Sequence, residues 1–192
     1  MIIDILTFLL VILTALSSFL TGLETKTLQS DFTLTISADA TQPINYIGNV
    51  TMCGEQFRLN FLDMEAAYDG KTLYLYQADT DELTLSHPTE QELMETNPFL
   101  YARALSKVCN ITERTANNGQ TIITLTPKDQ TIGIQRFVLT LDKNEIPIRA
   151  EIHEGKKVTT LSLKNAIYVQ QPFGKYQLQA TDYPTAFVND LR

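Results

Sequence analysis

The two histidines are the side chains of this chain best suited to general acid–base chemistry, because imidazole titrates near neutral pH. His87 stands directly before Pro88, and His153 falls on the polar side of a predicted strand. Neither has a second histidine or a Cys-x-x-Cys pair at a spacing that ligates a transition metal. We interpret both as solvated histidines and expect that the chain is not an enzyme.

The sequence lacks the motifs that hold nucleotides or activate a serine. Its eight glycines are too scattered for a dinucleotide fingerprint or a phosphate-binding loop, and it contains no G-x-S-x-G elbow. Asp79, Asp81 and Glu82 form an acidic turn, but this turn lacks the glycine and the terminal glutamate of an EF-hand. We therefore expect no cofactor and no metal ion.

The two cysteines, Cys53 and Cys109, allow one disulfide if the protein is exported to an oxidising compartment. Their positions in the sequence do not show whether their Cα atoms lie close enough to bond. Pairing therefore stays an open alternative at this point.

The charge of the chain excludes one broad class of partner. The 192 residues include 22 acidic and 15 basic side chains, which gives a net charge of −7. Nucleic-acid binding needs a basic surface that releases counterions, so we expect no nucleic-acid partner. With 44% hydrophobic and 19% charged residues, the chain has the composition of one globular domain.

Apolar and polar residues alternate along much of the chain, which is typical of strands with one buried face. The alternating apolar residues include Phe32, Leu34 and Ile36, then Phe57, Leu59 and Phe61, then Phe137, Leu139 and Leu141, then Ile148, Ala150 and Ile152. Turn signals such as Asp69-Gly70 and Asn118-Gly119 separate these runs at short spacings. The pattern predicts an antiparallel sheet of about ten or eleven strands.

A helical interruption is predicted in the middle of the sheet, from Thr89 to Leu105. Thr89 and Glu92 have the spacing of a capping box, in which each side chain satisfies an amide of the first turn. Asn97-Pro98 should end this helix and begin a second one, because proline suits the first helical position.

The N-terminal segment is strongly apolar and carries no charge from Ile5 to Gly22. One interpretation is a secretory signal peptide over residues 1–17 with a cleavage site at Ala15-Leu16-Ser17, although no Lys or Arg precedes the apolar run. The alternatives are an amphipathic helix of the folded protein, with Thr7, Thr14, Ser17, Ser18 and Thr21 on one polar stripe, or a membrane anchor. The first two interpretations overlap if the helix of the mature protein begins around Ser18. We expect protein from its native cell to lack the leading residues, which leaves a single domain over residues 18–192.

Four short segments follow one another in the order of a known family's motifs. They are Leu28-Gln29-Ser30-Asp31-Phe32-Thr33, Asp69-Gly70-Lys71-Thr72-Leu73-Tyr74-Leu75-Tyr76, Asn97-Pro98-Phe99 and Leu125-Thr126-Pro127-Lys128. They resemble the helix-to-strand junction, the DGKTLW-x-Y strand, the start of a lid helix and an L-T-P-K strand end of the LolA family. That family consists of periplasmic carriers of outer-membrane lipoproteins. The resemblance extends from about Leu28 to Val169.

The resemblance implies an α+β fold, in which a strongly curved, half-open antiparallel sheet resembles an unclosed β-barrel. An N-terminal helix and short lid helices would cover its concave apolar face, and the space between would receive the acyl chains of a lipoprotein. The side chains expected to bind these chains are Phe32, Leu34, Ile36, Phe57, Leu59, Phe61, Leu73, Leu75, Phe99, Leu100, Phe137 and Leu139. Phe99 and Leu100 would close the cavity mouth.

The family's activity implies a periplasmic monomer that takes lipoproteins from an ATP-driven exporter in the inner membrane. It would give them to an acceptor in the outer membrane. The alternative is a periplasmic regulatory protein of the same fold, which senses lipid or lipoprotein and binds a partner protein.

One departure from the family concerns the turn Met52-Cys53-Gly54-Glu55. Family members often have a Lys-Arg-Pro turn there, and its arginine helps to hold the lid closed. The nearby Arg58 is not a safe replacement for it. We therefore expect the closed lid of this chain to depend mainly on apolar contacts.

Overall fold

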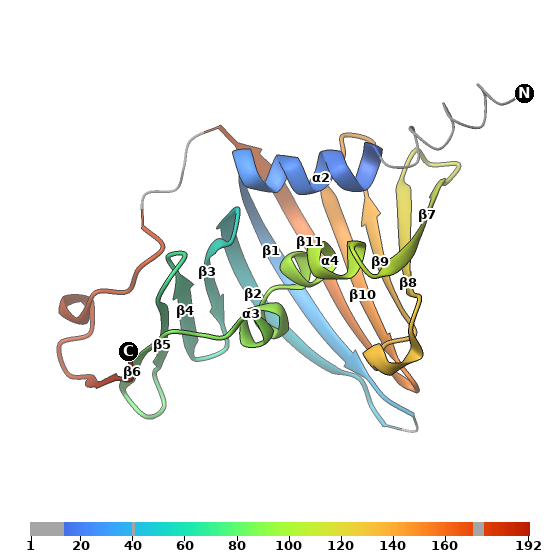
Figure 1. Ribbon diagram of the computed structural model, residues 1–192. Helices are drawn as coiled ribbons and strands as arrows, with labels where there is room; N and C mark the ends of the chain where they lie inside the picture. Colours follow the sequence, from blue (N-terminus) through green and yellow to red (C-terminus); the bar gives the residue numbers. More distant parts are fainter. Residues whose placement is uncertain (1–13, 40, 171–174) are drawn as a thin grey trace, which may run out of the picture.

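The computed structural model describes residues 14–39, 41–170 and 175–192, which form a long sheet with helices on one face (Figure 1). The helices are α2 (Thr14–Thr25), α3 (Glu90–Thr96) and α4 (Pro98–Ser106), and two 3-10 turns are η1 (Gln130–Ile132) and η2 (Ala180–Asp182). The strands are β1 (Thr27–Ser37), β2 (Ile44–Cys53), β3 (Gln56–Phe61), β4 (Met64–Tyr68), β5 (Leu73–Gln77), β6 (Glu82–Ser86), β7 (Cys109–Thr115), β8 (Thr121–Pro127), β9 (Arg136–Leu141), β10 (Pro147–Glu154), β11 (Lys157–Val169) and β12 (Phe187–Asp190).

The sheet has twelve strands in the order β12-β6-β5-β4-β3-β2-β1-β11-β10-β9-β8-β7. Neighbouring strands are antiparallel, except that β12 pairs with β6 in parallel. Helices α3 and α4 connect the run β1 to β6 with the run β7 to β11, and β11 returns to pair with β1. The sheet is not closed, because β12 and β7 lie at its two edges. The predicted unclosed antiparallel sheet is therefore confirmed, with more strands than the ten or eleven expected.

One part of the concave face is covered by α2 and α4 and forms the main core (Figure 1). Leu125, Phe137 and Leu139 on β8 and β9 are fully buried there. The helices contribute Phe19 and Phe99, whose rings meet edge to face with their centroids 5.4 Å apart. The concave face of β1 to β5, with parts of β10 and β11, is not filled in this way and lines a cavity under α3 and α4.

Helix α2 spans Thr14–Thr25, so it includes residues before Ser18, where the helix is expected to begin if the signal and the helix overlap. Only 4% of the Leu16 surface is exposed, and its backbone N–H donates to the Glu113 carboxylate at 3.2 Å. The residues predicted as a cleavage site are therefore part of a folded helix. The apolar run at residues 5–13 and the signal peptide predicted there lie outside the described residues. Of the described helices, none has the length and apolar character needed to cross a membrane.

The two predicted lid helices are present, and the predicted residues begin them. Thr89 and Glu92 form a complete capping box, with the Thr89 amide donating to the Glu92 carboxylate at 2.7 Å. Buried Asn97 ends α3 and caps α4, because its side-chain oxygen accepts from the Phe99 amide at 3.0 Å. Pro98 is the first residue of α4. One buried asparagine thus joins two short helices.

The C-terminal residues 175–192 pack on the outer face of the sheet. Leu178 is buried against Ala67, Tyr74 and Leu83 of β4 to β6, and η2 follows it. Tyr183 donates to the Glu65 carboxylate at 2.5 Å, after which β12 adds to the edge at β6. The sequence patterns did not place this segment.

The two cysteines are free thiols, so the disulfide that the sequence left open is not present. Cys53 ends β2 and alternates with Met52, which faces the concave side, so its own side chain points to the other side of the strand. Cys109 begins β7 and is buried in the core cluster. Burial raises the pKa of its thiol.

Candidate functional site

A cavity of about 750 Å³ lies between the concave face of the sheet and the lid helices. Strand residues that line it are Phe32, Leu34, Ile36, Val50, Met52, Phe57, Leu59, Phe61, Met64, Ala66, Leu73, Leu75, Ala150, Ile152, Glu154, Lys157, Thr159 and Leu161. The lid contributes Gln91, Met94, Thr96, Asn97, Pro98, Phe99 and Tyr101. The volume is typical of small-molecule sites, and most of the lining is apolar. Such a cavity favours a hydrocarbon ligand over a polar one.

Nine of the twelve side chains predicted to bind acyl chains line this cavity. They are Phe32, Leu34, Ile36, Phe57, Leu59, Phe61, Leu73, Leu75 and Phe99. The strand register brings them together: Leu59 on β3 lies directly beside Val50 on β2 and Ala66 on β4. Antiparallel pairing therefore gathers the alternate residues of successive strands into one wall.

The other three predicted side chains do not line the cavity. Phe137 and Leu139 have no exposed surface and pack in the core, where the Tyr101 ring meets the Phe137 ring at 6.4 Å. Leu100 packs against the same core. We correct the prediction for these residues, because alternation identifies the face of a strand but not the part of that face that a helix covers.

Several further apolar side chains, which were not predicted to bind acyl chains, also line the cavity. They are Val50, Met52, Met64, Ala66, Met94, Pro98, Tyr101, Ala150, Ile152 and Leu161. Val50 and Met52 alternate with polar residues on β2, so the signal for them was available in the sequence. Met52, Met64 and Met94 have flexible thioether side chains, which adapt to ligands of different shapes.

Gly48 makes room for an aromatic ring at the cavity wall. It lies on β2 opposite Phe32 on one side and Phe61 on the other. A methyl group on Gly48 would lie 2.5 Å from the Phe32 ring and 2.3 Å from the Asn60 carbonyl oxygen. A glycine at this position therefore lets the Phe32 ring lie against the strand.

One end of the cavity carries charge. Glu154 and Lys157 face each other across the hairpin of β10 and β11, with Lys157 Nζ 3.0 Å from Glu154 Oε2. Tyr101 lies in the same cavity, and its pKa is raised by burial and then by the Glu154 carboxylate. The sequence offered no motif for this pair, because a single acid and a single base near a turn occur in many surface hairpins.

The lid is tied to the body of the protein by an arginine from the lid itself. Arg103 of α4 donates to Glu24 of α2 at 2.8 Å and lies 3.9 Å from Glu55 in the turn between β2 and β3. Arg58 instead pairs with Glu65 at the sheet's outer face, where Glu65 also binds Tyr183. The two ion pairs are partly exposed and add to the apolar contacts of α4, whose Phe99, Ala102 and Leu105 are buried.

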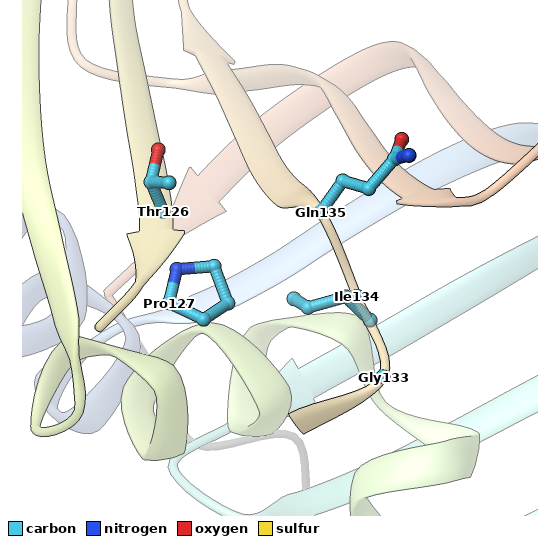
Figure 2. Close-up of a pocket in the computed structure, with 5 residues that line it drawn as sticks. All are labelled: Thr126, Pro127, Gly133, Ile134 and Gln135. Atoms are coloured by element: carbon cyan, nitrogen blue, oxygen red, sulfur yellow. The ribbon is translucent and has the colours of Figure 1, made fainter. Parts of the chain in front are cut away.

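A smaller cavity of about 450 Å³ lies beside the end of β8. Thr126, Pro127, Gly133, Ile134 and Gln135 line it, and Figure 2 shows Pro127 and Ile134 facing one another across it. None of these five residues carries a charge or a nucleophilic thiol. The larger cavity is therefore the better candidate for a binding site.

The two histidines considered for chemistry line neither cavity. His87 is exposed, and His153 contacts Glu151 at 3.0 Å and Arg136 at 3.3 Å. His153 alternates on β10 with the cavity residues Ile152 and Glu154, which places it on the outer face. Within the described ranges, no group of three histidine, cysteine or acidic side chains could hold a metal ion.

Comparison with known families agrees with this geometry. The family described as outer membrane lipoprotein carrier protein LolA matches residues 52–173, which is more than half of the chain. The chain belongs to the LolA family. Among curated proteins, a search finds no match to the sequence. The LolA match covers most of the strands that form the cavity, together with both lid helices.

Solved structures share the fold at low sequence identity. An uncharacterised conserved protein from Thermus thermophilus aligns with a TM-score of 0.54 and 14% identity, over 91% of this chain and 96% of its own. The MucB–MucA complex of Pseudomonas aeruginosa aligns with a TM-score of 0.51 and 16% identity, over 86% of this chain and 60% of the other. A LolA superfamily protein from Nitrosomonas europaea has a TM-score of 0.41 and 10% identity, over 81% of this chain and 94% of its own. At these identities the first two matches show the fold alone.

Proposed function

We propose that this LolA-family protein is a periplasmic carrier that binds the acyl chains of lipoproteins and ferries them from the inner to the outer membrane. The observation that carries the proposal is the apolar cavity of about 750 Å³ under two short helices. The protein would act as a monomer and carry out no catalytic step. Its partners would be acylated lipoproteins, an exporter in the inner membrane and an acceptor in the outer membrane.

The energetic need for such a carrier follows from the cost of exposing an acyl chain to water. Each methylene contributes about 0.8 kcal/mol, so about fifteen of them cost on the order of 12 kcal/mol. A lidded apolar cavity removes most of that cost during passage through an aqueous compartment. Release must also be feasible, and flexible aliphatic, methionine and aromatic contacts suit reversible binding.

A second candidate is a periplasmic regulatory protein of the same fold, which senses lipid or lipoprotein and binds a partner protein. It is supported by the MucB–MucA complex, in which a protein of similar fold binds another protein. The alignment covers 60% of that other chain. The apolar cavity under the two short helices supports the carrier better.

Binding of a synthetic triacylated lipopeptide tests the carrier directly. Purified protein should keep the lipopeptide in solution during gel filtration and release it to liposomes. The lipopeptide should displace an apolar fluorescent dye from the cavity. The same peptide without acyl chains should not bind. Binding of the unacylated peptide with equal affinity would favour the regulatory protein, and failure to hold the acylated form would contradict the carrier.

A further inference from the structure

The charged pair Glu154 and Lys157 differs from every other described residue that lines the large cavity, because the others carry no charge. The two residues flank the Gly155-Lys156 turn and are direct cross-strand partners, so both side chains emerge on the same face. Their neighbours on that face, Ile152 and Thr159, also line the cavity. The pair therefore lies on the concave face of the sheet, at the exposed rim of the cavity, and not on the outer face.

The cavity has an apolar end and a charged end. Met52 and Phe57, beside the turn between β2 and β3, are only 2% and 3% exposed. Met52 pairs with Leu28 near the start of the long strand β1. Lys157 begins β11 close to Thr159, which pairs with Ile36 near the other end of β1. Burial of hydrocarbon is favoured at the first end, whereas a polar group needs partners or water. A ligand with both parts should therefore lie with its polar part at the second end.

Each residue of the pair can also exchange the other residue for a polar group of a ligand. The side chains of Lys157 and Glu154 are 51% and 38% exposed, and an ion pair in such surroundings contributes little to stability. A ligand group can therefore replace one member of the pair at little cost. Lys157 offers an ammonium to an anion or a carbonyl oxygen, and Glu154 offers a carboxylate to an N–H group or a cation.

We propose that Glu154 and Lys157 bind the polar end of an acyl ligand and select ligands whose head carries both an acceptor and a donor. The inference rests on the proposed function, since it assumes that acyl chains occupy the cavity. Phosphatidylethanolamine and the acylated end of a lipopeptide both have this chemistry. The assignment makes the pair a determinant of specificity, whereas the apolar wall supplies most of the affinity.

Charge-reversal variants and three probes with the same hydrocarbon tail test the assignment. Palmitate, hexadecylamine and hexadecanol differ only at the polar end, and their affinities are measured by displacement of an apolar fluorescent dye. Lys157→Glu should weaken palmitate about tenfold, strengthen hexadecylamine and leave hexadecanol unchanged. Glu154→Lys should do the reverse. Lys156→Glu is the matched control, because Lys156 carries the same charge on the same turn but pairs with Asp39 outside the cavity.

The outcomes separate this assignment from the proposed function. Equal changes for all three probes, or the same discrimination in Lys156→Glu, would overturn the assignment while leaving the carrier intact. Failure of the unaltered protein to bind hexadecanol would overturn both. Phosphatidylethanolamine and a triacylated lipopeptide are then compared in Lys157→Met, and the ligand whose affinity falls is the source of the head group. If neither falls, the assignment is overturned.

Discussion

At the scale of single residues, Leu59 and Asn60 are sequence neighbours on β3 that face opposite sides of the sheet. Replacing Leu59 with arginine puts a charge among apolar side chains, so affinity for a triacylated lipopeptide should fall at least about tenfold. The free energy of unfolding should fall by only about 1 kcal/mol, because a long side chain can reach water from the cavity. Dye displacement and urea unfolding measure the two effects.

The matched control for this prediction is Asn60→Arg. Asn60 donates to Asn49 at 3.0 Å and does not line the cavity. Its replacement should leave lipopeptide affinity within about twofold of the original. A loss of several kcal/mol in stability for Leu59→Arg, with unchanged binding in the folded fraction, would show that Leu59 is a core residue only.

Glu113 gives a prediction for pH dependence. It accepts from the Leu16 amide in the first turn of α2, but desolvation is the larger effect and raises the pKa of its carboxyl above the ordinary 4.5. A carboxyl whose pKa is raised by folding destabilises the folded state once it ionises, so the cost is absent below the ordinary pKa and complete above the raised one. Glu113→Gln should therefore gain stability relative to the unaltered protein between pH 4 and pH 7.

Urea unfolding of both proteins at pH 4 and pH 7 measures this gain, and groups common to both cancel in the difference. The amide oxygen of glutamine can still accept from Leu16, so the helix contact is kept. A stability difference that does not change between the two pH values would contradict the role given to desolvation.

At the scale of elements, the start of α2 contains the predicted signal-peptide cleavage site at Ala15-Leu16-Ser17. Leu16 and Phe19 lie in the core, with 4% and 1% of their surfaces exposed. Leu16→Ala should lower the free energy of unfolding by about 2–4 kcal/mol, whereas Ser17→Ala at an exposed position should have little effect. A chain that begins at Ser18 should be destabilised like Leu16→Ala when compared with one that begins at Thr14. Equal stability of the two chains would show that the first turn of α2 is dispensable.

The lid provides a second prediction at this scale. Helices α3 and α4 have only 7 and 9 residues, so neither is stable without packing on the sheet. Amides from Glu92 to Leu105 should change their hydrogen-exchange protection when an acylated peptide binds, because the lid must move to admit acyl chains. Equal protection of this segment in both states, with changes elsewhere, would contradict its role as a lid.

The ion pairs of Arg103 should stabilise the closed position of α4. Arg103→Ala removes the contacts with Glu24 and Glu55, and exposed ion pairs contribute at most about 1 kcal/mol each. Amides of α4 should therefore exchange about fivefold faster in the unliganded protein. Arg58→Ala is the control, because Arg58 pairs with Glu65 and touches neither Glu24 nor Glu55. Faster exchange of α4 in Arg58→Ala as well would point to general loosening instead.

At the scale of the whole molecule, local patterns predicted most of the fold. Alternation on β1 and β3 identified six of the side chains that line the cavity, and Thr89 with Asn97-Pro98 located both lid helices. These features depend on interactions within a few residues or between neighbouring strands. Such interactions leave a pattern in the sequence that can be read without the structure.

Features that depend on distant contacts could not be predicted in this way. Strand β12 pairs in parallel with β6, although their paired residues lie more than a hundred positions apart in the sequence. No hairpin turn connects them, so no local signal predicts the pairing. Phe137 and Leu139 alternate like the cavity residues, and only the position of α4 shows that they are core. The contact between Arg103 and Glu24 likewise joins residues whose pairing has no local signal.

The central claim is that the large cavity holds acyl chains in the cell, and native mass spectrometry of protein purified from its host tests it most directly. We predict a bound mass of one acylated protein or lipid per chain, which is lost in Leu59→Arg and kept in Asn60→Arg. Recovery of the bare chain alone, or of a bound mass without acyl groups, would contradict the account.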